Sequence, residues 1–239
     1  MAGMINLPAS TSIKVGTIFV PHGSLEKTLA ASVRPLLFGD EEGTGYYSKR
    51  GTCTLLNWRS DLFAFFTRHQ LEGKGDIDRQ SPENIRIPMN NLGEASFPPK
   101  EIFRATKTDQ GGEFEDIVGV EIATSEITHP YQRGFATPAS HEDRAQPAQL
   151  YICVGCPTRE GELDYDDPKI NINTFTLPAL QGENFTTNVP WLRKLVLKNN
   201  APEVPYDGMS GGAVFAFRGH LGEFACTFEV TLPPVLNPV

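Results

Sequence analysis

Residues 204–217 read VPYDGMSGGAVFAF, so a single serine, Ser210, stands among three glycines directly before an apolar run. Glycine adopts backbone conformations that other residues resist, and one interpretation is therefore a tight turn that leads into a buried strand. The other is a nucleophile whose backbone neighbours must come very close to a substrate carbonyl. The rest of the chain bears on both interpretations.

Short apolar runs bounded by turn residues recur along all 239 residues. They are rich in Val, Ile, Phe and Thr, as in IKVGTIFV, CTLLNW, LFAFFT, DIVGVEI, QLYICVG and AVFAF. Their lengths suit strands, and 22 glycines and 19 prolines favour many turns. Two segments, 24–37 and 188–200, could form helices. The pattern predicts an all-β fold of the barrel or sandwich class with a minor helical part.

A polar stretch over residues 124–147 has no sustained periodicity and contains Pro130, Pro138 and Pro147. It separates the apolar runs into two groups of similar size. We therefore expect two packed β units, residues 1–125 and 126–239, joined by a crossing segment.

The composition also bears on partners and location. A net charge of -8 without a Lys/Arg cluster argues against nucleic-acid binding, since phosphate contacts need clustered positive charge. No apolar stretch approaches the roughly 20 residues that span a bilayer, so we expect no membrane partner. The first residues lack the basic start and apolar core of a signal peptide, which favours the cytoplasm.

Four cysteines are few for a secreted scaffold and are compatible with free thiols. Cys153 and Cys156 have the spacing of half a zinc site or of a redox motif. A structural zinc site needs a second pair of ligands, and none exists at similar spacing. The surrounding sequence, QLYICVGCP, is typical of a buried strand that ends in a turn, which favours core cysteines.

The segment GMSGG satisfies the G-x-S-x-G pattern of α/β-hydrolases, whose triad runs in the order Ser, acid, His. After Ser210 the chain contains one histidine, His220, and no aspartate, so that order cannot readily be met. The order His, Asp, Ser can be met. His69 ends the apolar run of DLFAFFTRHQL and Asp116 opens that of EDIVGVEI, so both are expected at strand ends. The other upstream histidines are expected in loops or in the crossing segment: His22, His129 and His141.

The stretches GTGYY, CTLLNWRSDLFAFFTRHQL, EDIVGVEI, LYICVGCP and YDGMSGGAVF occur in this order over roughly residues 35–230. Together they resemble trypsin-like (chymotrypsin-fold) serine peptidases, especially bacterial ones without disulfides. The resemblance implies two packed six-stranded β-barrels with a catalytic triad at their interface. It also implies hydrolysis of a protein or peptide substrate without a metal or cofactor.

By this resemblance Ser210 is the nucleophile, His69 the general base and then acid, and Asp116 the residue that orients the imidazole. The backbone amides of Gly208 and Ser210 form the oxyanion hole. Val204 lies near the base of the specificity pocket, which suits an apolar or small substrate side chain.

The sequence departs from the family pattern at several positions. Met209 replaces the aspartate that pairs with a freshly cut N-terminus, so activation by N-terminal cleavage is not expected. Gln70 stands where secreted relatives often have cysteine, which leaves Cys53 without its usual bridge partner. Arg68 stands where a small residue usually precedes the histidine. The missing small residues beside His69 and the short segment after the serine keep open a second function, a protease-fold binding or scaffold protein with weak or no catalysis. An activating protein partner is not identified by the sequence.

Overall fold

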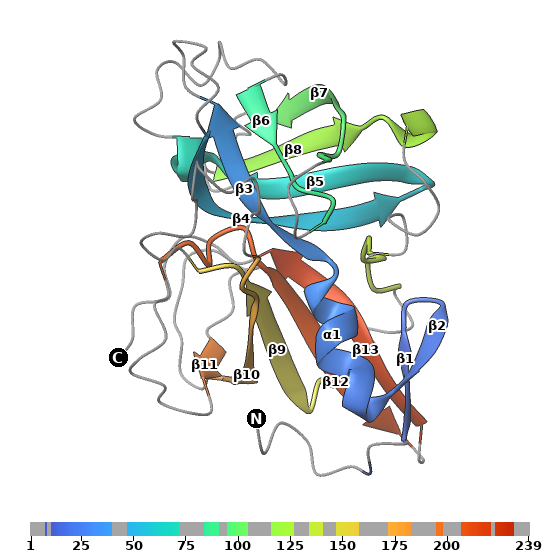
Figure 1. Ribbon diagram of the computed structural model, residues 1–239. Coiled ribbons are helices and arrows are strands. Elements are labelled where there is room, and N and C mark those ends of the chain that lie inside the picture. The colour runs from blue at the N-terminus through green and yellow to red at the C-terminus, as the bar shows by residue number, and fades with distance from the viewer. Residues whose placement is uncertain are drawn as a thin grey trace, which may run out of the picture.

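The computed structural model describes residues 8, 11–39, 47–71, 84–90, 95–104, 116–126, 134–140, 147–157, 172–182, 195–197, 207–220 and 223–231. These residues form two β-sheets, one above the other in Figure 1, and a single short α-helix. The prediction of an all-β fold with a minor helical part is confirmed. No helix in these ranges is long and apolar enough to cross a membrane.

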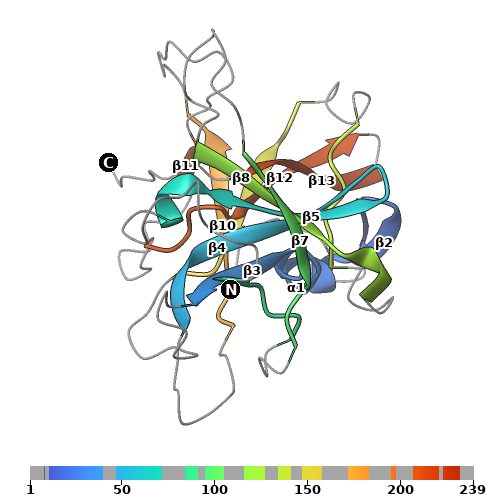
Figure 2. The same ribbon diagram turned by 90° about the horizontal axis from the view of Figure 1, so that it is seen from above.

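The first sheet has six strands in the order β6-β3-β4-β5-β8-β7, and all its pairings are antiparallel. Their bounds are β3 (Val33–Gly39), β4 (Tyr47–Trp58), β5 (Asp61–Thr67), β6 (Ile85–Arg86), β7 (Pro99–Arg104) and β8 (Ile117–Ile122). In β5 the apolar residues that alternate toward one face, Leu62, Ala64 and Phe66, enter the core of this sheet. Seen from above, this sheet lies over the second one (Figure 2).

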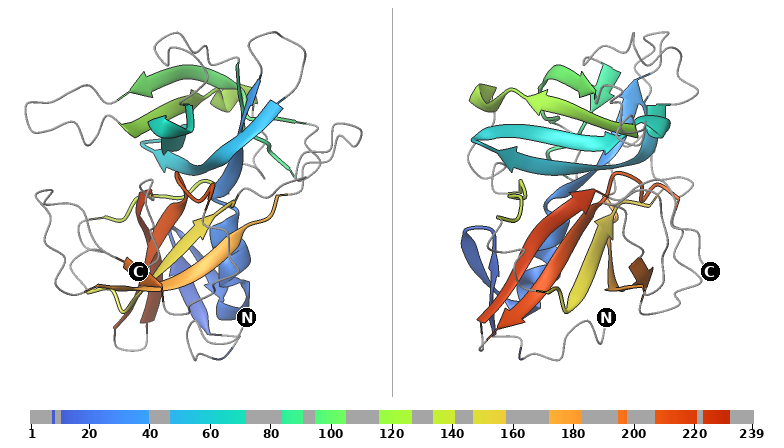
Figure 3. Two further views of the ribbon diagram at one scale, coloured as in Figure 1. Left: turned by 90° about the vertical axis from the view of Figure 1, so that its left-hand side faces the viewer. Right: turned by 180° about the vertical axis from the view of Figure 1, so that it is seen from behind.

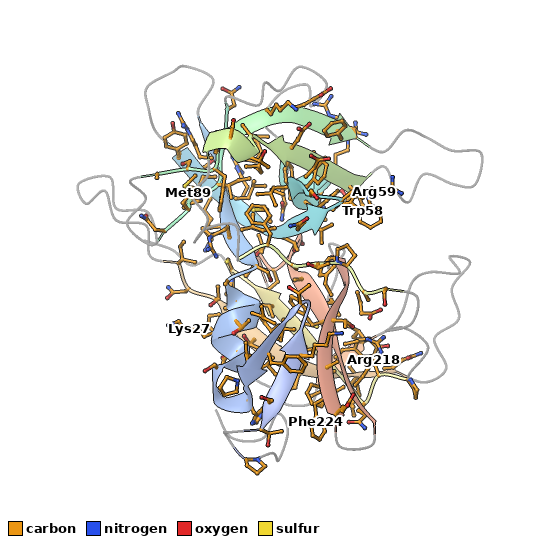
Figure 4. All side chains as sticks on the ribbon, turned by 90° about the vertical axis from the view of Figure 1, so that its right-hand side faces the viewer. Lys27, Trp58, Arg59, Met89, Arg218 and Phe224 are labelled. Atoms are coloured by element: carbon orange, nitrogen blue, oxygen red, sulfur yellow. The ribbon has the colours of Figure 1, made fainter. Side chains whose placement is uncertain are left out.

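The hairpin that joins β4 to β5 turns at Arg59 and Ser60, which have φ angles of 52° and 75°. The Arg59 guanidinium lies 5.6 Å from the centre of the Trp58 ring, and both side chains are at the tip of the hairpin (Figure 4). Strands β4 and β5 are thus consecutive and closely paired.

The second sheet has seven strands in the order β11-β10-β9-β12-β13-β1-β2, one more than the six expected. Their bounds are β1 (Ser12–Val15), β2 (Ile18–Pro21), β9 (Leu150–Gly155), β10 (Phe175–Gln181), β11 (Leu195–Leu197), β12 (Ala213–His220) and β13 (Glu223–Thr231). Every residue of β9 is buried, because the strand lies inside the sheet and is covered on both faces. Figure 3 shows β9, β12 and β13 beneath the first sheet from two further sides.

The N-terminal hairpin belongs to the second sheet. Strand β1 pairs in parallel with β13, and the helix α1 (Leu25–Ala30) buries Leu25 and Leu29 in the core of that same sheet. By strand pairing, residues 12–30 therefore lie with the C-terminal half, although the sequence suggested one unit over residues 1–125. The division near residue 125 stays a prediction.

The helical expectation for residues 24–37 is wrong beyond Ala30. Residues from Val33 onward form β3 and pair with β4, and Pro35 within them has no amide hydrogen for a helical bond. In the second expected helix, 188–200, residues Leu195–Leu197 form β11, and the rest lies outside the described residues.

A described part of the crossing segment, residues 134–140, binds both sheets. Ala136 accepts a hydrogen bond from the Asn57 amide (2.7 Å) and donates one to the Leu55 carbonyl (2.9 Å). Ala139 donates to the Phe228 carbonyl of the second sheet (3.1 Å). The segment thus ties the two sheets together at this point.

Candidate active site

His69 and Asp116 meet because their strands are neighbours. His69 lies in the 3-10 turn η2 (Arg68–Leu71), directly after β5, and Asp116 directly precedes β8. Since β5 and β8 pair antiparallel, with Thr67 opposite Ile117, the end of one strand lies beside the start of the other. The expectation that both side chains stand at strand ends agrees with this placement.

Asp116 holds His69 through three contacts. Its Oδ2 lies 3.0 Å from His69 Nδ1, and its Oδ1 lies 3.2 Å from the same nitrogen. Oδ1 also accepts the backbone amide of His69 at 2.9 Å. A nitrogen that faces two carboxylate oxygens must carry the hydrogen, so the neutral imidazole has its lone pair on Nε2. The carboxylate therefore fixes both the position and the tautomer of the ring.

The partner of Nε2 is Thr67. The hydroxyl of this buried threonine lies 3.3 Å from Nε2 and can donate a hydrogen bond to the lone pair. The nitrogen that would accept a proton from a nucleophile thus already has a donor from its own strand.

The serine lies in a turn, residues 207–212, that precedes β12 in the second sheet. Gly208 and Gly211 both have φ = 80°, a conformation that residues with a side chain rarely adopt. The Gly212 amide closes the turn by donating to the Met209 carbonyl at 2.9 Å. Met209 itself is buried, and its sulfur lies so close to Gly155 that a Cβ there would be 2.7 Å away. Met209 therefore anchors the serine turn to β9.

Strand β4 of the first sheet holds the serine turn from the other side. The Thr52 amide donates to the Ser210 carbonyl (3.1 Å), and the Thr52 hydroxyl donates to the Gly208 carbonyl (2.7 Å). The Thr54 hydroxyl donates to the Gly211 carbonyl (2.8 Å). Sequence reasoning missed these two threonines. Their signal is the alternation of Thr52 and Thr54 on one face of a strand, within a run that is otherwise apolar.

Ser210 lies beside the histidine turn but is not joined to the imidazole. Within the described ranges its hydroxyl makes no hydrogen bond, and its carbonyl accepts from Thr52 and from the Gln70 side chain. The amides of Gly208 and Ser210 likewise have no acceptor among those residues. Val204, expected near the specificity pocket, lies outside the described residues, as do His129 and His141. His22 lies in the turn η1 (His22–Ser24) before α1.

None of the four cysteines forms a disulfide and all are buried, which agrees with the interpretation as core residues. Burial raises the pKa of Cys153 to about 12 and raises that of Cys53 and Cys226 further still. Gly51 of β4 lies against Gln70, since a Cβ on Gly51 would lie 2.5 Å from Gln70 Nε2. The described residues contain no group of His, Cys, Asp and Glu side chains that could hold a metal ion.

No family model matches the chain, and no curated protein matches it. Among solved structures, it is similar to a thermostable serine protease, AL20, from an extremophilic microorganism, with 13% identity and a TM-score of 0.45 over 88% of each chain. It is also similar to a scabies mite inactivated protease paralogue, S-I1, with 13% identity and a TM-score of 0.45. That similarity covers 85% of this chain and 91% of the mite protein.

Proposed function

We propose that this protein is a serine endopeptidase in which Ser210, His69 and Asp116 act as a triad. The main observation in its support is that Asp116 binds both the imidazole ring and the backbone amide of His69. It gives the imidazole the tautomer that a general base needs, with Nε2 free of hydrogen.

In this mechanism the Ser210 hydroxyl attacks the substrate carbonyl while Nε2 of His69 takes its proton. Asp116, 3.0 Å from Nδ1, stabilises the imidazolium that forms. The oxyanion accepts hydrogen bonds from the amides of Gly208 and Ser210, and one such donor is typically worth about 3 kcal/mol. The imidazolium then gives its proton to the leaving amine, which leaves an acyl-enzyme on Ser210. Water, deprotonated by the same imidazole, hydrolyses this ester.

The turn geometry supports the oxyanion assignment. Gly208 has φ = 80°, and its carbonyl is bound to the Thr52 hydroxyl, so the orientation of the turn is fixed from the first sheet. A donor that is fixed before the substrate binds costs no reorganisation when the negative charge develops.

A protease-fold binding protein is the second candidate function, and one contact favours it. Thr67 occupies Nε2 in this structure, and the Ser210 hydroxyl has no bond to it within the described residues. For catalysis the serine hydroxyl must replace Thr67 as the donor to Nε2. A binding protein would not need this exchange.

Incubation with a mixture of unfolded proteins, followed by mass spectrometry of the new peptide ends, tests the proposal. The wild-type protein is expected to generate new ends, preferentially after apolar or small residues if Val204 lines the pocket. Ser210→Ala and His69→Ala should generate none. If the wild-type protein cuts nothing but binds the same peptides as Ser210→Ala, the result would support the binding protein instead.

A further inference from the structure

Gln70, the residue after His69, turns its side chain away from solvent and into the contact between the two sheets. It is buried, with 5% of its surface exposed. Its Nε2 donates to the carbonyl of Ser210 and, at 3.2 Å, to the carbonyl of Thr52. One amide group therefore joins the histidine turn, strand β4 and the serine turn.

Two glycines make room for this amide. A Cβ on Gly51 would lie 2.5 Å from Gln70 Nε2, and a Cβ on Gly211 would lie 3.2 Å from it. Side chains at these positions would fill the space that the amide occupies. Gly51 on β4 and Gly211 beside the serine thus shape one pocket around the Gln70 side chain.

The hydrogen bonds fix which end of the amide faces the serine turn. If the amide were reversed, its oxygen would face two carbonyl oxygens, so Nε2 must point toward them. The other end, Oε1, is buried and has no partner within the described part of the chain. A buried polar group with an unpaired atom destabilises the folded state. The two hydrogen bonds that Nε2 donates offset this cost and so account for a glutamine at this buried position.

We propose that Gln70 is a positioning residue that couples the turn of the general base to the turn of the nucleophile. The proposal rests on the endopeptidase function proposed above. His69 and Gln70 are consecutive: Asp116 fixes the backbone of the first, and the second binds the carbonyl of Ser210. The contacts form one chain from carboxylate to serine, so a displacement of either turn displaces the other.

Two substitutions of similar size separate positioning from space filling. Gln70→Met keeps the volume but loses both donated bonds, and we expect kcat to fall about tenfold with KM unchanged. Gln70→Glu places carboxylate oxygens against two carbonyl oxygens, and we expect a fall of about 100-fold because the turns are pushed apart. If both variants keep the wild-type kcat, the proposal is wrong.

Ser32→Ala is the control away from the site, because it removes one buried bond from a side chain to the backbone, where Gln70→Met removes two. The Ser32 hydroxyl donates to the Leu29 carbonyl at 2.6 Å, at the end of α1 and outside the candidate site. Ser32→Ala and Gln70→Met should lower the melting temperature by comparable amounts, while only Gln70→Met lowers kcat. An equal fall of kcat in the control would show that general destabilisation explains the effect.

Hydrogen exchange provides a readout that does not depend on catalysis. In Gln70→Met, the amides of residues 68–71 and those of 207–212 should both exchange faster, and in Ser32→Ala neither group should change. Faster exchange in both turns of a protein that cuts no peptide would support the coupling and refute the endopeptidase. Peptide cleavage with unchanged exchange and unchanged kcat in Gln70→Met would support the endopeptidase and refute the coupling.

Discussion

The backbone beside the serine leaves no room for a side chain at position 211, so Gly211→Ala is a strong test of the site. A Cβ there would lie 2.1 Å from the carbonyl oxygen of Thr52, against the 3.0 Å below which such contacts essentially do not occur. The Cβ position is fixed by the backbone and the Thr52 carbonyl is part of it, so neither can rotate away. The serine turn and β4 must separate by about 0.9 Å.

Two effects set the magnitude. An alanine at φ = 80° is strained by roughly 1–2 kcal/mol. The separation also weakens the hydrogen bonds from Thr54 to Gly211 and from Thr52 to Ser210, each worth about 1 kcal/mol. We expect the free energy of unfolding to fall by about 3–4 kcal/mol. A displacement of this size at the nucleophile should slow the reaction of Ser210 about 100-fold.

Urea unfolding gives the stability, and the second-order rate of inactivation by a fluorophosphonate gives the reactivity of Ser210. Gly16→Ala is the matched control, since Gly16 also has a positive φ (58°) but a Cβ there meets no described residue closer than 3.7 Å. The control should lose only the strain of roughly 1–2 kcal/mol and react at the wild-type rate. If Gly211→Ala is as stable as this control and reacts with the fluorophosphonate at the wild-type rate, the described contact between β4 and the serine turn is refuted.

Three further predictions concern the imidazole and the thiols. Asp116→Asn should favour the wrong tautomer of His69 and lower kcat by about 10⁴-fold, measured with a peptide substrate; a loss below tenfold would contradict the assigned role. Thr67→Val removes the donor that competes for Nε2 and should raise the inactivation rate of Ser210 about fivefold, whereas a lower rate would show that Thr67 assists the base. The four buried cysteines should resist a thiol reagent at pH 8 until the protein unfolds, since burial holds the pKa of Cys153 at about 12. The folded state keeps the Cys153 thiol protonated, so this group contributes its full stability below the unfolded pKa of about 8.5. That contribution is lost as the pH rises toward 12, and urea unfolding between pH 7 and 10 can follow the loss.

The sequence predicted those features that local patterns encode. Short runs rich in β-branched and aromatic residues gave the all-β class, and their ends placed His69 and Asp116 where neighbouring strands meet. A glycine-rich turn before an apolar run marked the start of β12.

Features that depend on distant parts of the chain could not be predicted in this way. Nothing near β1 in the sequence indicates that it pairs with β13, which belongs to the C-terminal half of the chain. Thr52 and Gly208 are 156 positions apart, and Gln70 and Ser210 are 140 apart. In the sequence, Gln70 stands out only as a position where a cysteine was expected. A single polar residue after a histidine does not indicate that its side chain is buried. Only the packing of the two sheets reveals that its amide is enclosed.

Intact-mass analysis after treatment with diisopropyl fluorophosphate tests whether Ser210 is a nucleophile activated by His69. We expect one adduct per chain, located on Ser210 by peptide mapping, and a much slower reaction in His69→Ala. A wild-type chain that gains no adduct, or one whose adduct on Ser210 forms equally fast without His69, would contradict the assignment of a serine nucleophile activated by this histidine.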